Sequence, residues 1–150
     1  MSAAPSQDLE VRQSCIAGAG LGLFTLGSRK AGEHICTYTG THLGLRDALR
    51  GKDKAYLMRL GPRCYVDAAG DGHADVMARY INDCRNPAGF NVTFDKQPGA
   101  SPPHAVVVAL RDIGAGEELF VDYGRWYWAA LRPQRLSITE LCRARGLLPQ

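Results

Sequence analysis

The chain has 150 residues, with 18 lysines and arginines against 15 aspartates and glutamates, for a net charge of +3. This length suits a single domain, which at this size buries roughly two thirds of the surface that its unfolded chain exposes. A hydrophobic fraction of 45% is typical of a globular protein and excludes disorder over the whole chain. No run of about 18 apolar residues is present, which argues against a membrane-spanning helix. The small net charge does not by itself indicate nucleic-acid binding.

The N-terminal residues 1–10 lack the basic start and apolar core of a secretory signal, so we expect an intracellular protein with reduced thiols. Residues 1–7 are predicted to form a disordered tail. The five cysteines are Cys15, Cys36, Cys64, Cys84 and Cys142. No two of them have the C-x-x-C spacing typical of zinc and redox sites, so no metal is expected.

Short segments rich in β-forming residues alternate with glycines along most of the chain. The predicted strands are Leu9–Ile16, Leu23–Leu26, Glu33–Tyr38, Ala55–Arg59, Cys64–Asp67, Gly89–Phe94, His104–Leu110 and Glu118–Asp122. The strongest strand pattern runs through Ala105 to Leu110, where β-branched residues follow a pair of prolines. Many short strands separated by glycine turns predict a mostly β fold rather than a parallel α/β sheet.

Helices are predicted to be few and short. Leu43–Leu49 and Ala74–Ile81 each have room for about two turns. The clearest helical signal lies near the end, where Ser137 and Glu140 have the spacing of a capping box. We therefore expect a C-terminal helical extension over residues 133–150.

Three glycine-containing motifs have both a functional and a structural interpretation. The alternating glycines of residues 18–24 would let a backbone approach a ligand closely, although a glycine-rich hairpin turn explains them better when they are taken alone. Their spacing fits neither a dinucleotide fingerprint nor a phosphate loop. Tyr38-Thr39-Gly40 predicts a turn. Residues 109–124 predict a hairpin that ends at Tyr123. A tyrosine at the end of a strand is more often structural than catalytic.

Two further motifs concentrate polar and aromatic residues. Residues 79–87 pack polar side chains after an apolar segment, which indicates either an ordered functional loop or a turn closed by Pro87. Trp126-Tyr127-Trp128 forms an aromatic cluster that either belongs to the core or stacks on a flat ligand such as adenine.

Taken in order, these motifs resemble the SET domain, the β-rich fold of protein-lysine methyltransferases. That family has a G-x-G segment, a Y-x-G turn, an R-[FY]-I-N-H-S-C-x-P-N loop, and a G-E-E-L-x-x-D-Y-G segment followed by Y-W. The matching residues here are Gly20-Leu21-Gly22, Tyr38-Thr39-Gly40, residues 79–87, residues 116–124 and Tyr127-Trp128. The resemblance covers residues 8–132 and implies a β-clip-like fold of several small sheets.

The chain departs from the family pattern after Asn82. Asp83 stands where the family has histidine, and Arg85 stands where it has a cysteine that serves as a zinc ligand in members with a cysteine-rich tail. This resembles a minimal SET protein without zinc-binding modules before or after the domain. The two replacements also leave a second interpretation open, namely a catalytically inactive SET domain that acts as an adaptor.

The resemblance implies methyl transfer from S-adenosylmethionine to a lysine side chain, with S-adenosylhomocysteine as the product. The reaction is an in-line displacement that needs a neutral amine. Because lysine's ordinary pKa is about 10.4, neutralising it at pH 7 costs on the order of 4 kcal/mol. An apolar, tyrosine-lined channel beside a sulfonium cation lowers that pKa.

The resemblance also implies a role for each motif residue. The expected catalytic residues are Tyr123 and Tyr38. The expected lysine channel contains Tyr38, Tyr65, Val121 and Tyr123. The expected cofactor-binding residues are Ala19, Gly20, Leu21, Arg79, Asn82, Asp83, Tyr123, Trp126 and Trp128. Val121 takes the position that limits the degree of methylation, and its small size favours more than one methyl group.

The expected partner is a protein or peptide with a target lysine, with histone tails as the first candidate and a nuclear location as the consequence. The loops at 41–54 and 97–103 are expected to form the walls of a groove in which an extended peptide adds as a strand. The C-terminal arginines are interpreted as a solvated helix face or as a contact to an acidic partner, so neither nucleic-acid nor membrane binding is expected. The oligomeric state is left open.

Overall fold

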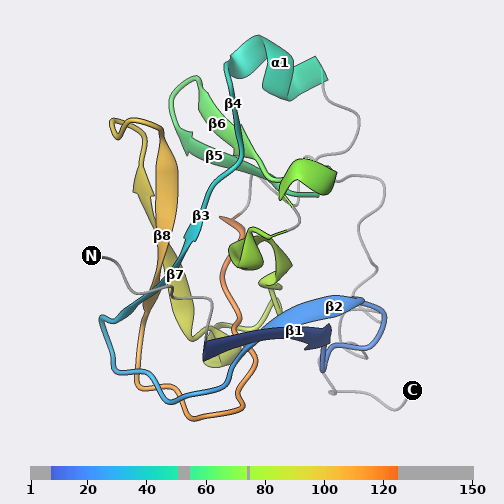
Figure 1. The fold of residues 1–150 in the computed structure, drawn as a ribbon, viewed down its shortest axis with the longest axis vertical. Helices are drawn as coiled ribbons and strands as arrows, with labels where there is room; N and C mark the ends of the chain where they lie inside the picture. Colours follow the sequence, from blue (N-terminus) through green and yellow to red (C-terminus); the bar gives the residue numbers. More distant parts are fainter. Residues whose placement is uncertain (1–7, 51–54, 74, 125–150) are drawn as a thin grey trace.

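Residues 8–50, 55–73 and 75–124 are described by the structure, a computed structural model. In these ranges the strands form a hairpin and two three-stranded sheets, all antiparallel, with strand orders β1-β2, β3-β8-β7 and β4-β6-β5 (Figure 1). The strands are β1 (Leu9–Gln13), β2 (Leu21–Thr25), β3 (His34–Tyr38), β4 (Thr41–Leu43), β5 (Leu57–Gly61), β6 (Cys64–Asp67), β7 (Val92–Gln97) and β8 (His104–Ala109). The predicted mostly β fold of several small sheets is confirmed.

The helices of the described ranges are short. They are α1 (Leu45–Arg50) and three 3-10 helices, η2 (Asp71–His73), η3 (Met77–Tyr80) and η4 (Pro87–Gly89). The helix predicted at Leu43–Leu49 therefore starts two residues later. The helix predicted at Ala74–Ile81 is reduced to η3. The predicted tail at 1–7 and the C-terminal helix at 133–150 lie outside the described residues.

The strand predicted from the β-branched run is confirmed as β8, which is the central strand of its sheet. Its alternate residues Ala105, Val107 and Ala109 are buried, while the residues between them are partly exposed. This period of two is what a strand needs when one face packs on the core. β8 hydrogen-bonds to β3 on one side and to β7 on the other.

Several predicted strand ends are wrong, for identifiable reasons. β1 ends at Gln13 rather than at Ile16, because the chain then turns through Gly18 and Gly20, whose φ angles are +80° and +77°. The strand expected from Gly89 begins at Val92, because η4 precedes it, and it continues to Gln97. Thr41–Leu43, which we expected within a loop, forms β4 against β6.

The strand predicted at Glu118–Asp122 is absent from the described structure. This segment makes isolated bridges instead, from Glu118 to Phe24 and from Phe120 to Asn82. The side chain of Asn91 also holds it: Nδ2 donates to the Glu118 carbonyl at 2.9 Å, and Oδ1 accepts from the Phe120 amide at 2.8 Å. A segment that crosses between two different elements cannot form a continuous ladder with either.

The main core lies between the hairpin, the β3-β8-β7 sheet and η3. Its fully buried residues include Leu23, Ile35, Ile81, Val107, Leu119 and Val121. In Figure 1 the last described segment, in orange, runs up through the middle of the molecule. The segment that leads to Tyr123 is thus packed against the main core. No helix within the described ranges is both long and apolar enough to cross a membrane.

Candidate active site

Two pockets meet at three shared residues, Ala55, Arg79 and Tyr123. One, which we call the aromatic pocket, has a volume of about 320 Å³. Its lining comes mainly from strand side chains: Tyr38, Ala55, Leu57, Met58, Arg59, Arg79, Ile81, Thr93, Phe94, Lys96, Asp122, Tyr123 and Gly124. The other, which we call the glycine pocket, has a volume of about 340 Å³ and is lined by Ala19, Gly20, Leu21, Ala55, Tyr56, Arg79, Tyr80, Asn82 and Tyr123.

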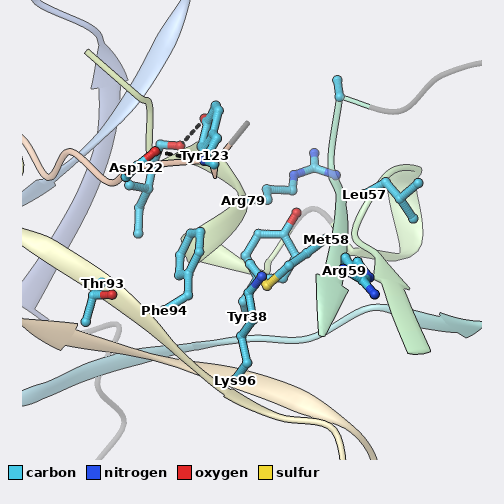
Figure 2. A pocket seen from close by; sticks show the side chains of 13 residues that line it. Tyr38, Leu57, Met58, Arg59, Arg79, Thr93, Phe94, Lys96, Asp122 and Tyr123 are labelled. Atoms are coloured by element: carbon cyan, nitrogen blue, oxygen red, sulfur yellow. Dashed lines mark hydrogen bonds between the residues drawn. The ribbon is translucent and has the colours of Figure 1, made fainter. Parts of the chain in front are cut away.

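The aromatic pocket is walled by residues from separate strands (Figure 2). Tyr38 comes from the end of β3 and Phe94 from β7, and their rings lie edge to face with centroids 5.7 Å apart. Met58 comes from β5. The Tyr38 hydroxyl donates to the Tyr56 carbonyl at 2.5 Å, which fixes the direction of its ring.

Tyr123 is held at both ends by the neighbouring loop. Its hydroxyl donates to the carbonyl of Ile81, and its backbone amide donates to the Asp83 carboxylate at 2.9 Å. Two residues earlier, the Val121 amide donates to the Asn82 carbonyl at 3.0 Å. The tyrosine segment and the 81–83 loop therefore form one hydrogen-bonded unit.

Asp83, which replaces the family histidine, is buried and has a structural use. One carboxylate oxygen accepts from the Arg85 amide at 2.6 Å, and the other accepts from the Tyr123 amide. A carboxylate offers only acceptors, so it suits a position that faces two backbone N–H groups. The replacement fits the local geometry that positions Tyr123.

The glycine pocket is edged by backbone. Gly20 has a positive φ, and a Cβ built on it would meet no atom within 4 Å, so this stretch of chain is open. Asn82 fixes the neighbouring strand, since its Nδ2 donates to the Leu21 carbonyl at 3.0 Å and to the Glu118 carboxylate at 3.3 Å. The pocket thus combines an uncovered backbone with one oriented amide side chain.

Glu118 lies beneath this edge and is 5% exposed. Its carboxylate accepts from the Ser14 hydroxyl at 2.7 Å and from the Cys15 amide at 2.8 Å. A Cβ on Gly22 would collide with this carboxylate, so the second glycine of the G-x-G motif serves packing rather than ligand access. Partial burial, followed by the nearby Glu118 charge, raises the pKa of the Cys15 thiol, which disfavours a reactive thiolate there.

The glycine of the Y-x-G motif also has a packing role. A Cβ on Gly40 would collide with the carbonyl of Asp67, because β4 starts directly against the end of β6. Tyr38 must enter the aromatic pocket just before this close approach. The motif therefore couples the tyrosine to the crossing from one sheet to the next.

Arg79 lies where the two pockets meet. Its guanidinium stacks on the rings of Tyr56 and Tyr80, with its central carbon 4.9 Å from each ring centroid. It also donates to the carbonyls of Ala68 and Gly70 at 2.8 and 3.1 Å. Most of its donors are thus used within the protein, while its buried Nε has no hydrogen-bond partner.

The structure brings most of the sequence-predicted site residues to these pockets. Ala19, Gly20, Leu21, Arg79, Asn82 and Tyr123 line the glycine pocket, and Tyr38 lines the aromatic pocket. Tyr65 is buried in a separate cluster with Ala48 and Leu57. Val121 is buried in the main core, and neither it, Tyr65 nor Asp83 lines either pocket. Trp126 and Trp128 lie outside the described residues.

Sequence reasoning missed several lining residues, notably Tyr56, Met58, Arg59, Phe94 and Lys96. Phe94 reaches Tyr38 because β7 and β3 both pair with β8. The alternation within β7 could have placed Phe94 and Lys96 on one face. It could not have shown which strand lies opposite that face.

The described residues offer no evident metal site, because no three His, Cys, Asp or Glu side chains among them gather closely enough. The glycine pocket could hold a polar organic ligand. Its open backbone at Gly20 and its Asn82 amide suit a polar ligand that lies along the chain. The shared residue Tyr123 would bring such a ligand next to whatever occupies the aromatic pocket.

Comparisons with known proteins identify the family of the chain. Residues 20–124 match the family model described as SET domain. The N-lysine methyltransferase KMT5A-A of Danio rerio is 31% identical over 121 residues, which covers 73% of this chain and 33% of the relative. The histone-lysine N-methyltransferase trithorax of Drosophila melanogaster is 34% identical over 113 residues, covering 69% of this chain and 3% of the relative.

A third relative is the H3 lysine-4 specific histone-lysine N-methyltransferase of Saccharomyces cerevisiae, 34% identical over 110 residues, which covers 68% of this chain and 10% of the relative. The chain thus spans about a third or less of the length of these curated relatives. The family match includes Gly20, Tyr38, Arg79 and Tyr123, the motif residues that the two pockets bring together. The chain belongs to the SET domain family.

Proposed function

We propose that this protein is a protein-lysine N-methyltransferase that uses S-adenosylmethionine. The observation that carries the proposal is the position of Tyr123, which lines both the aromatic and the glycine pocket. Methyl transfer needs two reactants that enter separately and meet at one point. A shared tyrosine between two differently built pockets suits that requirement.

The glycine pocket is the proposed cofactor site. S-adenosylmethionine, when bound, supplies a methyl group activated by a sulfonium centre. The backbone of residues 19–21 and the side chain of Asn82 would hold it, with Arg79 at the junction of the pockets. The open surface at Gly20 lets a ligand approach the main chain, where backbone groups can bind it.

The aromatic pocket is the proposed lysine site. Tyr38, Phe94 and Met58 present ring and thioether surface that excludes water, which lowers the pKa of an entering lysine and favours its neutral form. The hydroxyl protons of Tyr38 and Tyr123 are committed to backbone carbonyls. We propose that their oxygens act as acceptors toward the ligand, for an amine N–H or for the weak C–H donors of a methyl group.

Positioning supplies much of the expected acceleration. A reaction between two held groups gains from orientation that a free encounter lacks. The double attachment of Tyr123 to Ile81 and Asp83 keeps this residue in place before either ligand arrives. The relatives act on histones or other proteins, as their names state, so we propose histones as the first substrates to test, with the nucleus as the site of action.

The test is transfer of a labelled methyl group from S-adenosylmethionine to mixed core histones. We expect label on a lysine with the wild-type protein and a loss of about a hundredfold or more with Tyr123→Phe. Tyr65→Phe is the control, because Tyr65 lines neither pocket, although it packs against Leu57 of the aromatic pocket. Equal transfer by Tyr123→Phe and the wild type would refute this role for the hydroxyl.

The replacements at Asp83 and Arg85 support a second candidate function. In it, the protein is an inactive adaptor that binds lysine-containing partners without transferring a methyl group. Cofactor binding separates the two. An occupied site at about 100 times its dissociation constant adds about 2.7 kcal/mol to the free energy of unfolding. We expect a matching rise in melting temperature with S-adenosylmethionine; no rise at saturating concentrations would favour the adaptor.

A further inference from the structure

The aromatic pocket carries two basic side chains on the side opposite Tyr123. Arg59 comes from β5 and Lys96 from β7, and both line the pocket. In Figure 2 Lys96 is drawn below the centre of the lining group and Arg59 to its right, with Asp122 and Tyr123 at the upper left. Among the described residues no carboxylate lies within ion-pair distance of either basic group.

The two cations repel each other. Lys96 is exposed over part of its surface, yet partial burial lowers the pKa of its ammonium group and repulsion from Arg59 lowers it further. Two like charges that have no counter-ion among the described residues make a place where an anion is stabilised. The carboxylate that lines the same pocket, Asp122, lies on the opposite side in Figure 2 and accepts a hydrogen bond from the Gly124 amide at 2.8 Å.

Strand geometry sets the distance between this positive end and the aromatic wall. Phe94 and Lys96 are two residues apart on β7 and point to the same face, which separates them by about 7 Å along the strand. An extended peptide has the same spacing between alternate residues. An anionic side chain about two positions from a bound lysine would therefore reach the basic pair.

We propose that Arg59 and Lys96 select substrates in which an aspartate or glutamate lies about two residues from the target lysine. The inference rests on the proposed function, because it takes the aromatic pocket as the lysine site. The carboxylate binds between the guanidinium, which can donate two parallel N–H bonds, and the ammonium group. A lysine or arginine at the same position is repelled, so the pair both attracts one class of substrate and rejects another.

The experiment uses fluorescein-labelled peptides with one central lysine in a glycine-serine background. Glutamate, glutamine or lysine is placed two positions before or after the central residue. Affinity is measured by fluorescence anisotropy, and methyl transfer is measured separately with labelled S-adenosylmethionine. We expect the better glutamate peptide to bind about tenfold more tightly than its glutamine counterpart, a difference of about 1.4 kcal/mol. The lysine peptide should bind more weakly than both.

Charge reversal supplies the decisive variant. Arg59→Glu combined with Lys96→Glu should invert the order, so that the lysine-flanked peptide binds best. Both positions are exposed, which favours retention of the fold, and circular dichroism checks it. The control is Lys30→Glu, an exposed lysine that lines neither pocket and should leave the order unchanged.

The two readouts separate the inference from the function on which it rests. Equal binding of glutamate and glutamine peptides by the wild type overturns the charge selection, even if methyl transfer occurs. A glutamate preference that the double variant inverts upholds the selection. If no peptide is then methylated, the proposed transferase function fails while the charge selection stands.

Discussion

The two pockets that meet at Tyr123 differ in the residues that line them. One edge of the glycine pocket is the chain of residues 19–21 beside the Asn82 amide, and the rest of its lining is Ala55, Tyr56, Arg79, Tyr80 and Tyr123. The aromatic pocket is walled by side chains that project from β3, β5 and β7. A pocket edged by backbone suits a ligand that does not vary, whereas a pocket walled by side chains can be adapted to one substrate.

Residues that match the family pattern line both pockets. Gly20, Leu21 and Asn82 line the glycine pocket, Tyr38 and Gly124 line the aromatic pocket, and Arg79 and Tyr123 line both. Arg59 and Lys96, two basic residues outside the family motifs, line the aromatic pocket and not the glycine pocket. We therefore expect substitutions to separate cofactor binding from peptide binding, except where both pockets depend on the same segment.

The largest expected effect comes from that common segment. Asn91 is 1% exposed, and its side chain bonds both the Glu118 carbonyl and the Phe120 amide. Asn91→Ala leaves one buried and one partly buried backbone group without their partner, so we expect the free energy of unfolding to fall by about 3 kcal/mol. Urea unfolding measures it, with the exposed β7 residue Asp95→Ala as the control. A loss similar to that of the control would show that Asn91 does not hold the segment.

Asn82→Ala should damage the glycine pocket alone. Loss of the amide frees the Leu21 carbonyl and removes one contact to Glu118, so the edge of the pocket loses its fixed position. We expect the affinity for S-adenosylhomocysteine to fall about tenfold, or about 1.4 kcal/mol, with little change in peptide affinity. Calorimetric titration measures both, and Asn86→Ala on the same loop is the control. An equal loss for both ligands would break the distinction between the pockets.

Phe94→Ala should do the reverse. The ring packs edge to face on Tyr38, and an aromatic pair of this kind contributes about 1 kcal/mol beyond the area that it buries. We expect peptide affinity to fall about fivefold while cofactor affinity stays unchanged. Phe90→Ala, a phenylalanine that lines neither pocket, serves as the control. A variant that weakens cofactor binding instead would contradict our assignment of the lysine site.

The smallest expected effect is on pH dependence. The pKa of Lys96 is lowered in the folded protein, so the charged ammonium disfavours folding until the pH rises through that lowered pKa. Lys96→Met should therefore raise the free energy of unfolding slightly at pH 7, by a few tenths of a kcal/mol because the group is exposed. The gain should shrink as the pH approaches the ordinary value of 10.5. Urea unfolding at both pH values, with Lys30→Met as the control, measures it; a gain that grows with pH would contradict the sign.

The same comparison explains how much the sequence could predict. The glycine pocket depends on local motifs, so its residues 19–21 and Asn82 could be identified along with Tyr38, Arg79 and Tyr123. β8 could also be predicted, because its β-branched residues lie in one continuous segment. Phe94, Met58 and Lys96 were missed because their roles depend on which strands lie opposite one another, and that information is spread over distant segments.

The wrongly predicted strand at Glu118–Asp122 has a related cause. Its apolar residues Leu119 and Val121 are buried, as in a strand, but its backbone partners are single bridges and the Asn91 side chain. A hydrophobic alternation reports burial and not the identity of the hydrogen-bond partner. The Asp83 substitution was similarly ambiguous, since only the structure relates its carboxylate to the Tyr123 amide.

The most direct test of the account is a crystal structure of the protein with S-adenosylhomocysteine and a lysine peptide. We expect the cofactor product along residues 19–21 beside Asn82, the lysine between Tyr38 and Phe94, and the lysine nitrogen and the cofactor sulfur on either side of the junction at Tyr123. Density for both ligands in one pocket, or for the cofactor product away from Tyr123, would contradict the claim that the two pockets bring separate reactants together.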